Sequence, residues 1–177
     1  NHEGGHQVIK AMGDINVASL SKKYPSAVWR HATGRSAAFL TVTLPKQGSS
    51  SSNQLTLSLE SNLKGIGINL PDPLAKKAGS EVVSRLDATL DSTSLRLNLK
   101  HGDILNSIVQ LKNDTPASQL RLDKAGIRLG TSPAQLPPGK TVQLSGQIQA
   151  PNVEAWQQDI NKSDLNGQRN NFSNKIK

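Results

Sequence analysis

Residues 84–100 read SRLDATLDSTSLRLNLK, and this stretch decides the fold. Apolar side chains occupy every second position on both sides of a short polar break, and charged or polar side chains lie between them. A period of two is typical of a β-strand with one apolar and one polar face. Asp91 and Ser92 at the break are residues that favour turns. The stretch therefore predicts two antiparallel strands joined by a tight turn.

The same alternation recurs over much of the chain. It is visible at residues 40–44, 54–60, 66–70, 105–111, 120–129 and 142–148. Stretches rich in Gly, Pro, Ser, Asn and Asp separate these segments, as expected for turns and loops. No strand–helix–strand rhythm is visible. We therefore predict a mainly β protein, an antiparallel meander of about eight or nine strands that forms a curved, trough-like or rolled sheet.

Two short helices complete the predicted fold. One is expected over residues 16–24 and the other over residues 152–160, because apolar side chains recur there at helical spacing. We expect residues 1–10 to extend into the first strand and residues 11–161 to form the β segment. Residues 162–177 are polar and are expected to be a tail or linker.

The composition narrows the possible functions. The chain has 177 residues, of which 34% are hydrophobic and only 3% aromatic, and it contains no cysteine. A disulfide framework or a thiolate metal site is therefore excluded, and no apolar run is long enough to span a membrane. The net charge of +8 would attract anionic lipid or nucleic acid. Because almost no aromatic side chains are available to stack on bases, we do not expect a nucleic-acid partner.

Sequence motifs for catalysis are missing. There is no G-x-S-x-G nucleophile turn and no glycine-rich phosphate loop. The run HEGGH at residues 2–6 lacks the helical spacing of a metalloprotease site, and we interpret it as a frayed terminus. His31 and His101 are isolated and fall in expected turns. We predict that the protein is not an enzyme and needs no cofactor or metal.

One face of the predicted sheet must be covered. Eight strands span about 40 Å, and each Leu, Ile or Val side chain on the face stabilises the fold by about 1.5–3 kcal/mol when it leaves water. Two short helices are too small to cover such a face. Either the sheet folds over itself as a sandwich or roll, or another molecule covers it, and that molecule could be an apolar ligand.

A family resemblance bears on this choice. Residues 63–79 read LKGIGINLPDPLAKKAG, a strand that ends at two prolines. The segment resembles a motif of the YhdP branch of the AsmA-like proteins, and weaker similarities extend over roughly residues 10–160. The motif positions at the proline corner are Leu70, Pro71, Pro73, Leu74 and Lys76. Proline cannot donate a ladder hydrogen bond, so we expect the corner to end a strand at a rim, where its lysines face solvent or anionic headgroups.

The resemblance implies a function. AsmA-like proteins of Gram-negative envelopes form long curved sheets with an aliphatic concave face, bridge the two membranes, and are linked to phospholipid transport. By this resemblance, the chain is expected to be a periplasmic segment of an inner-membrane-anchored protein, along whose groove phospholipid moves between inner and outer membranes. The implied partners are phospholipid acyl chains, neighbouring segments of the same long chain, and membranes reached through parts outside this chain.

The residues expected to contact lipid are the aliphatic members of the alternating segments. They are Leu55, Leu57, Leu59, Ile66, Ile68, Leu86, Leu90, Leu95, Leu97, Leu99, Leu120, Leu122, Ile127, Leu129, Val142, Leu144 and Ile148.

An alternative function belongs to a different class. The chain begins with asparagine rather than methionine, which we interpret as a piece of a longer protein. Such a piece could be a structural or assembly β module of a large envelope protein, with a closed core and no ligand. Its sheet edges would then stack on neighbouring segments. The two functions are compatible with each other.

Overall fold

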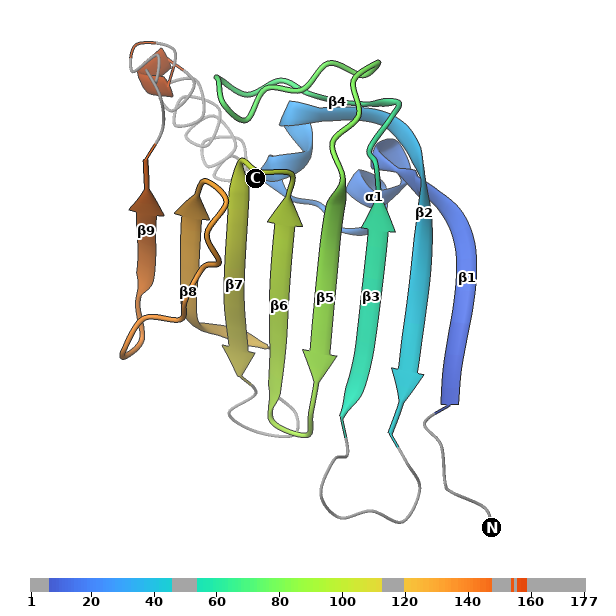
Figure 1. Ribbon diagram of the computed structural model, residues 1–177, viewed down its shortest axis with the longest axis vertical. Coiled ribbons are helices and arrows are strands. Elements are labelled where there is room, and N and C mark those ends of the chain that lie inside the picture. Colours follow the sequence, from blue (N-terminus) through green and yellow to red (C-terminus); the bar gives the residue numbers. More distant parts are fainter. Residues whose placement is uncertain (1–6, 46–53, 113–119, 148–153, 155, 159–177) are drawn as a thin grey trace, which may run out of the picture.

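The computed structural model describes residues 7–45, 54–112, 120–147, 154 and 156–158 (Figure 1). Its centre is one nine-stranded sheet in the order β1-β2-β3-β5-β6-β7-β8-β9, with β4 paired to β2 off this path. The strands are β1 (Gln7–Asn16), β2 (Ala32–Leu44), β3 (Leu55–Ser61), β4 (Ile66–Ile68), β5 (Ser84–Leu90), β6 (Ser94–His101), β7 (Leu105–Lys112), β8 (Arg121–Leu129) and β9 (Val142–Gly146). The two short helices are α1 (Val17–Lys23) and the 3-10 helix η1 (Ala27–His31). The mainly β fold is confirmed.

The hairpin predicted from residues 84–100 is present. β5 and β6 are antiparallel, and Ala88 lies opposite Leu97. Asp91 closes the turn, because its carboxylate accepts hydrogen bonds from the Ser94 hydroxyl (2.7 Å) and from the backbone N–H groups of Thr93 (2.8 Å) and Ser94 (2.7 Å). These bonds favour the charged carboxylate and lower the pKa of Asp91 to about 2.

Strand β1 is a long edge strand that the alternation alone does not show. It pairs with β2 over its whole length, from Gln7 opposite Leu44 to Asn16 opposite Arg35. β1 shows no apolar–polar alternation in the sequence, because apolar side chains occur on both of its faces. One of them, Met12, is 74% exposed on this edge strand.

The helix predicted over residues 16–24 is confirmed as α1. Asn16 is its N-cap and accepts a hydrogen bond from the backbone N–H of Ser19 (3.1 Å). Val17 is buried, so the helix is held against the sheet. Within the other predicted helix, residues 154 and 156–158 are helical, and Trp156 donates its indole N–H to the carbonyl of Asp72 (3.0 Å). The rest of that helix, the HEGGH run, Ile148 and the polar tail lie outside the described residues.

One part of the sheet is not a meander. β8 and β9 are parallel, so the chain between them must return to the other end of the sheet. Residues 130–141 make this return across the face turned toward the viewer in Figure 1. A Cβ atom at Gly126 would overlap the backbone carbonyl of Gln135, so only glycine permits the loop to pass this close. The sheet is mainly antiparallel, as predicted, and the β8–β9 pair is the departure from the expected meander among the described strands.

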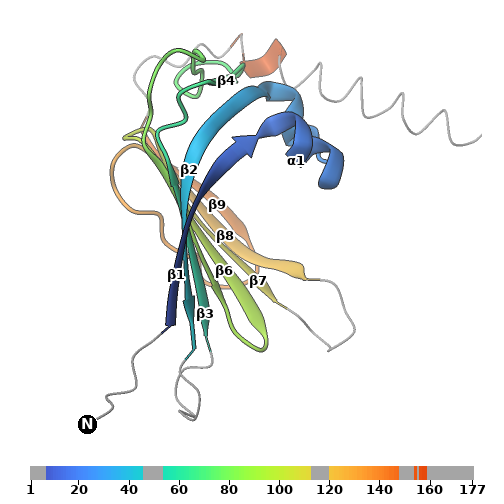
Figure 2. The same ribbon diagram turned by 90° about the vertical axis from the view of Figure 1, so that its right-hand side faces the viewer.

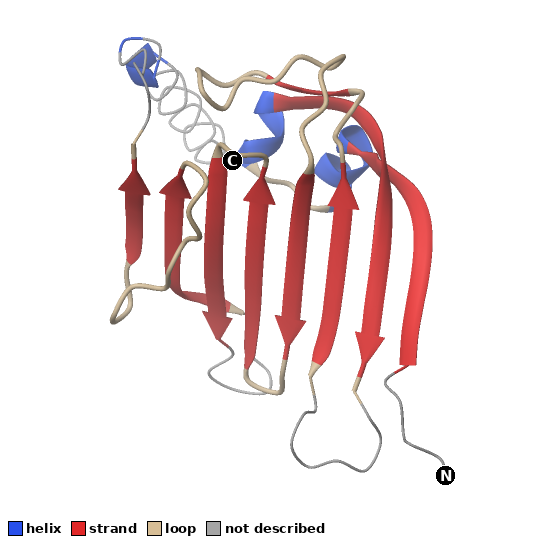
Figure 3. Ribbon diagram, viewed as in Figure 1, coloured by secondary structure: helices blue, strands red, loops and turns tan. Residues whose placement is uncertain are grey.

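The sheet is a single open layer. The helices lie at one end of it (Figure 3), and the ends of β1 and β2 bend over the face that carries α1 (Figure 2). Among the described residues the buried hydrophobic side chains are only Val17, Ala38, Ile66 and Ala125, and no large side chain is fully buried. The described residues therefore form an open curved sheet rather than a closed roll.

Candidate functional site

Three rows of side chains cross the sheet on the face that carries α1 and η1, and we call them the apolar face. Each row takes one residue from each strand along the sheet. The first row is Ala11, Leu40, Leu59, Leu86, Leu99, Ser107, Ile127 and Leu144. The second row is Ile9, Val42, Leu57, Ala88, Leu97, Val109, Ala125 and Val142. The third, shorter row is Leu55, Leu90, Leu95, Leu111 and Leu122.

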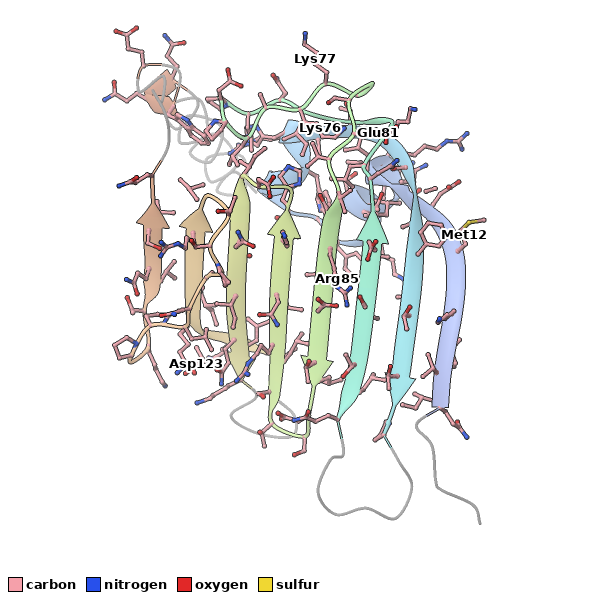
Figure 4. The ribbon with its side chains drawn as sticks, in the orientation of Figure 1. Met12, Lys76, Lys77, Glu81, Arg85 and Asp123 are labelled. Carbon is pink, nitrogen blue, oxygen red and sulfur yellow. The ribbon has the colours of Figure 1, made fainter. Side chains whose placement is uncertain are left out.

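The opposite face carries the charges, and we call it the polar face. Arg85 lies there between Glu60 and Lys100 on the neighbouring strands. Its guanidinium contacts the carboxylate of Asp87 at 2.9 Å and that of Glu60 at 3.7 Å (Figure 4). The hydrogen bond that Arg85 donates to the carboxylate of Asp87 is the main reason why the pKa of Arg85 is raised. Two faces of opposite character follow from the period-two sequence.

A bulge in β8 keeps the apolar face continuous. Leu122 and Ile127 differ in parity, so a regular strand would place them on opposite faces. The pairing of β7 with β8 shifts register at Gln110 and Leu111, and this shift returns both side chains to the apolar face. Asp123 at the bulge is buried and is paired with Lys112 Nζ at 3.2 Å.

The proline corner, residues 62–83, covers one end of the apolar face. β4 pairs antiparallel with the start of β2, with Ile66 opposite Gly34 and Ile68 opposite Ala32. Gly34 and Gly65 both have φ of 98°, and a Cβ on either would overlap the backbone of the other segment. We expected residues 66–70 to be a regular member of the meander. That expectation is wrong, because the close pairing with β2 draws this segment off the main sheet.

Lys76 stabilises the proline corner from inside. Its side chain is only 7% exposed, and Nζ donates to the carbonyls of Leu63 (2.8 Å), Ile66 (2.8 Å), Lys77 (3.1 Å) and Ser80 (2.7 Å). Burial lowers its pKa, and the more distant Glu81 partly opposes this shift. The expectation that Lys76 faces solvent or headgroups is wrong. Its neighbour Lys77 is exposed and extends outward in Figure 4.

A pocket of about 400 Å³ lies between the proline corner and the apolar face. Leu59, Leu86 and Leu99 come from the sheet, and Trp29 comes from η1. The other lining residues come from β1, η1, the proline corner and the neighbouring strands of the sheet. They are Ile15, His31, Ala32, Ser61, Leu63, Ile68, Leu70, Leu74, Ser84, Arg85, His101 and Leu105. The pocket is therefore mainly aliphatic. It continues the apolar face beneath the proline corner, which forms the roof of the pocket.

The structure separates the predicted lipid-contacting residues into three groups. Leu59, Ile68, Leu86 and Leu99 line the pocket, as do Leu70 and Leu74 of the family motif. Those on the uncovered part of the apolar face are Leu55, Leu57, Leu90, Leu95, Leu97, Leu122, Ile127, Val142 and Leu144. Leu129 lies opposite Leu105, next to the pocket, and Leu120 precedes β8 and is 45% exposed.

Ile66 is the exception. It is 5% exposed inside the proline corner and is not among the residues that line the pocket. It supports the roof instead of offering a surface to a ligand.

Several pocket residues were missed from the sequence. Ile15 and Trp29 lie in segments without alternation, and only the bend of β1 and β2 brings them to the pocket. Trp29 has its indole N–H bound to the carbonyl of Tyr24 (2.7 Å), which fixes its ring. His101 is wrongly expected in a turn. It is the last residue of β6 and is 8% exposed.

The described residues show neither a metal centre nor a membrane-spanning helix. They contain no cluster of three or more His, Cys, Asp or Glu side chains that could hold a metal ion. None of the helices in this part of the chain has the length and apolar character needed to cross a bilayer.

The described residues define a class of protein: a one-layer curved β-sheet whose aliphatic face they cover only at one end, under the proline corner. The family model described as "YhdP protein" matches residues 2–176. The chain therefore belongs to the YhdP family, in agreement with the motif at the proline corner, and this membership indicates an AsmA-like protein of the cell envelope. No curated protein and no solved structure matches the chain significantly.

Proposed function

We propose that this chain is a segment of a periplasmic lipid conduit that moves phospholipid between the inner and outer membranes. Acyl chains would lie on the apolar face while headgroups stay in water. The observation that carries the proposal is that the rows on this face are almost wholly aliphatic and that, beyond the proline corner, no other described part of the chain covers them. Membership of the YhdP family supports it.

The exposure of the apolar face favours a ligand. Leu122 is 54%, Val142 55% and Leu144 67% exposed, which are high values for large aliphatic side chains that face the same side. Covering one such side chain stabilises the protein by about 1.5–3 kcal/mol. Lipid acyl chains have the matching chemistry, and they need no specific polar partner.

The direction of the rows suggests how a lipid would move. The rows run across the strands, and the seven gaps from the first to the last of the eight strands add up to roughly 34 Å at the usual strand spacing. Along this path an acyl chain would exchange one aliphatic contact for another, and the described residues of the rows include no charged side chain, because Glu60, Arg85 and Lys100 lie on the polar face. Movement along the face would be passive, and the direction and energy of transport would come from elsewhere.

A pair of double substitutions tests the proposal. Leu57→Glu with Leu97→Glu places two carboxylates on the second row, and Ser58→Glu with Asn98→Glu places the same charges one residue away on the polar face. Protein purified from Gram-negative cells is analysed by native mass spectrometry, lipid extraction and circular dichroism. We expect phospholipid to co-purify with the wild type and the polar-face variant, but not with the folded apolar-face variant. Equal lipid in both variants, or none in the wild type, would refute the conduit.

The open edges of the sheet favour a second role, assembly with neighbouring segments of the same long protein. β1 is a ten-residue edge strand that pairs with β2 and with no other described strand. If stacking is the role, a proline at Ala11 should impair assembly of the longer protein more than it impairs lipid capture. Equal loss of both would speak against a separate assembly role.

A further inference from the structure

The pocket under the proline corner contains one polar group that the described residues leave incompletely bonded. His101 lines the pocket at the end of β6 and is 8% exposed. Its Nδ1 lies 2.7 Å from the hydroxyl of Ser84 on the adjacent strand. Its second ring nitrogen, Nε2, has no hydrogen-bond partner among the described residues. Buried polar groups are nearly always paired, so an unpaired nitrogen beside a cavity points to a ligand.

The imidazole is neutral and its proton can be assigned. Burial lowers the pKa of His101, and the nearby positive charge of Lys76 lowers it further. Ser84 has one hydroxyl proton and two acceptors in reach, His101 Nδ1 at 2.7 Å and the carbonyl of Val82 at 3.3 Å. We assign the proton to the shorter bond, which makes Nδ1 the acceptor and leaves Nε2–H as a donor; in the other arrangement Ser84 donates to Val82 and accepts from Nδ1–H, which makes Nε2 an acceptor, and the ¹⁵N shifts of the ring distinguish the two.

Other polar groups at the pocket already have partners. Ser61 donates to the carbonyl of Ala37 (2.7 Å) and accepts from the backbone N–H of Leu63 (3.0 Å). Trp29 is bonded to Tyr24, and Arg85 to Asp87 on the polar face. His101 is thus the donor that remains for a ligand.

The surroundings of His101 define the chemistry of the ligand. A single donor at the end of an aliphatic pocket matches one acceptor atom attached to an aliphatic chain. A phosphate group would need several donors or cations, and the ammonium of Lys76 already donates to four carbonyls. The acyl oxygen of a lipid, either the ester carbonyl of a phospholipid or the carboxyl of a free fatty acid, has the required form.

We infer that His101 Nε2–H donates a hydrogen bond to the acyl oxygen of a lipid whose chain fills the pocket. This inference rests on the proposed function, since it takes the ligand of the apolar face to be a lipid. The hydrogen bond from His101 would hold a lipid at one defined position on a face whose other contacts are aliphatic. Ser84 is a positioning residue, because its hydroxyl sets the tautomer and orientation of the ring.

The test compares lipids that differ only in the acyl oxygen. Vesicles of a diacyl phosphatidylcholine, vesicles of its dialkyl ether analogue with the same chains, and free laurate are each offered to the 177-residue chain. The variants are His101→Phe and, as a matched control in the same pocket, Leu99→Ala. We expect the wild type to bind the diacyl lipid about three- to tenfold better than the ether lipid, in line with one neutral hydrogen bond. His101→Phe should lose this preference, whereas Leu99→Ala should weaken both lipids alike.

A second measurement does not depend on a variant that folds. The ring nitrogens of His101 are followed by ¹⁵N NMR in the wild type, and Nε2 should shift with the diacyl lipid but not with the ether lipid. If laurate shifts Nε2 and the diacyl lipid does not, the source of the acyl oxygen is a free fatty acid. Equal binding of both phosphatidylcholines with no Nε2 shift from any probe would overturn the inference and leave the conduit intact. Failure to bind any of the three would overturn the conduit and this inference with it.

Discussion

Replacing Lys76 with methionine removes the central donor of the proline corner. Nζ is within 3.1 Å of four backbone carbonyls, and an ammonium group has three protons to share among them. A hydrogen bond to a charged group contributes about 1.5–3 kcal/mol, and the cost of burying the charge, which is also why the pKa is lowered, offsets part of the sum. We therefore expect Lys76→Met to lower the free energy of unfolding by about 3 kcal/mol.

Urea denaturation followed by circular dichroism measures this change, and Lys77→Met is the matched control. Lys77 is the exposed neighbour on the same turn, so its replacement should change stability by less than about 0.5 kcal/mol. For a chain of this size, the loss at Lys76 corresponds to a fall in melting temperature of about 6–12 °C. If the two variants prove equally stable, the four-carbonyl contact does not support the roof of the pocket, and the reasoning is wrong.

Three further predictions concern other parts of the fold. Gly126→Ala should lower the free energy of unfolding, measured in urea, by about 1–3 kcal/mol, because the new Cβ would overlap the carbonyl of Gln135. Gly13→Ala is the control, since Gly13 has open space around it and its replacement should have little effect. Equal effects of the two substitutions would contradict the close passage of residues 130–141 over Gly126. The pKa of His101 is lowered below its usual value of 6.5, so the unfolded chain takes up the proton first, and the free energy of unfolding should fall as the pH drops through and below about 6.5, with a smaller fall in His101→Gln. Asp91 has a pKa of about 2 in the folded protein, so its contribution to stability is present above the unfolded pKa of 3.8 and is lost as the pH falls toward 2. In Asp91→Asn the urea midpoint should therefore depend less on pH over this range, and a pH dependence equal to that of the wild type would refute the prediction.

Period-two alternation was sufficient to predict the central part of the fold. In residues 84–100 every apolar position falls on one face, and the Asp91 turn fixes the register that aligns Leu86 with Leu99. Adjacent hairpins extend the same alignment, so one correct register places whole rows of leucines together. The two-faced sheet and the residues on its apolar face are therefore local consequences of the sequence.

The roof of the pocket depends on contacts that are distant along the chain. The thirteen-residue strand β2 pairs with β3 at one end and with β4 at the other, and alternation carries no sign of this division. Lys76 has the sequence appearance of a surface lysine, and only the path of residues 63–80 surrounds it with carbonyls. The role of His101 likewise depends on Ser84, seventeen residues away.

The most direct test of lipid on the apolar face is site-specific photocrosslinking in Gram-negative cells. A photoreactive amino acid is placed at Leu97 or at its neighbour Asn98, which lie on opposite faces of β6, and the same pair of positions is used at Leu57 and Ser58 on β3. After irradiation, radiolabelled phospholipid attached to the protein is measured. The account predicts adducts at Leu97 and Leu57 and none at Asn98 and Ser58. Adducts of equal strength at both positions of each pair, or at neither, would contradict it.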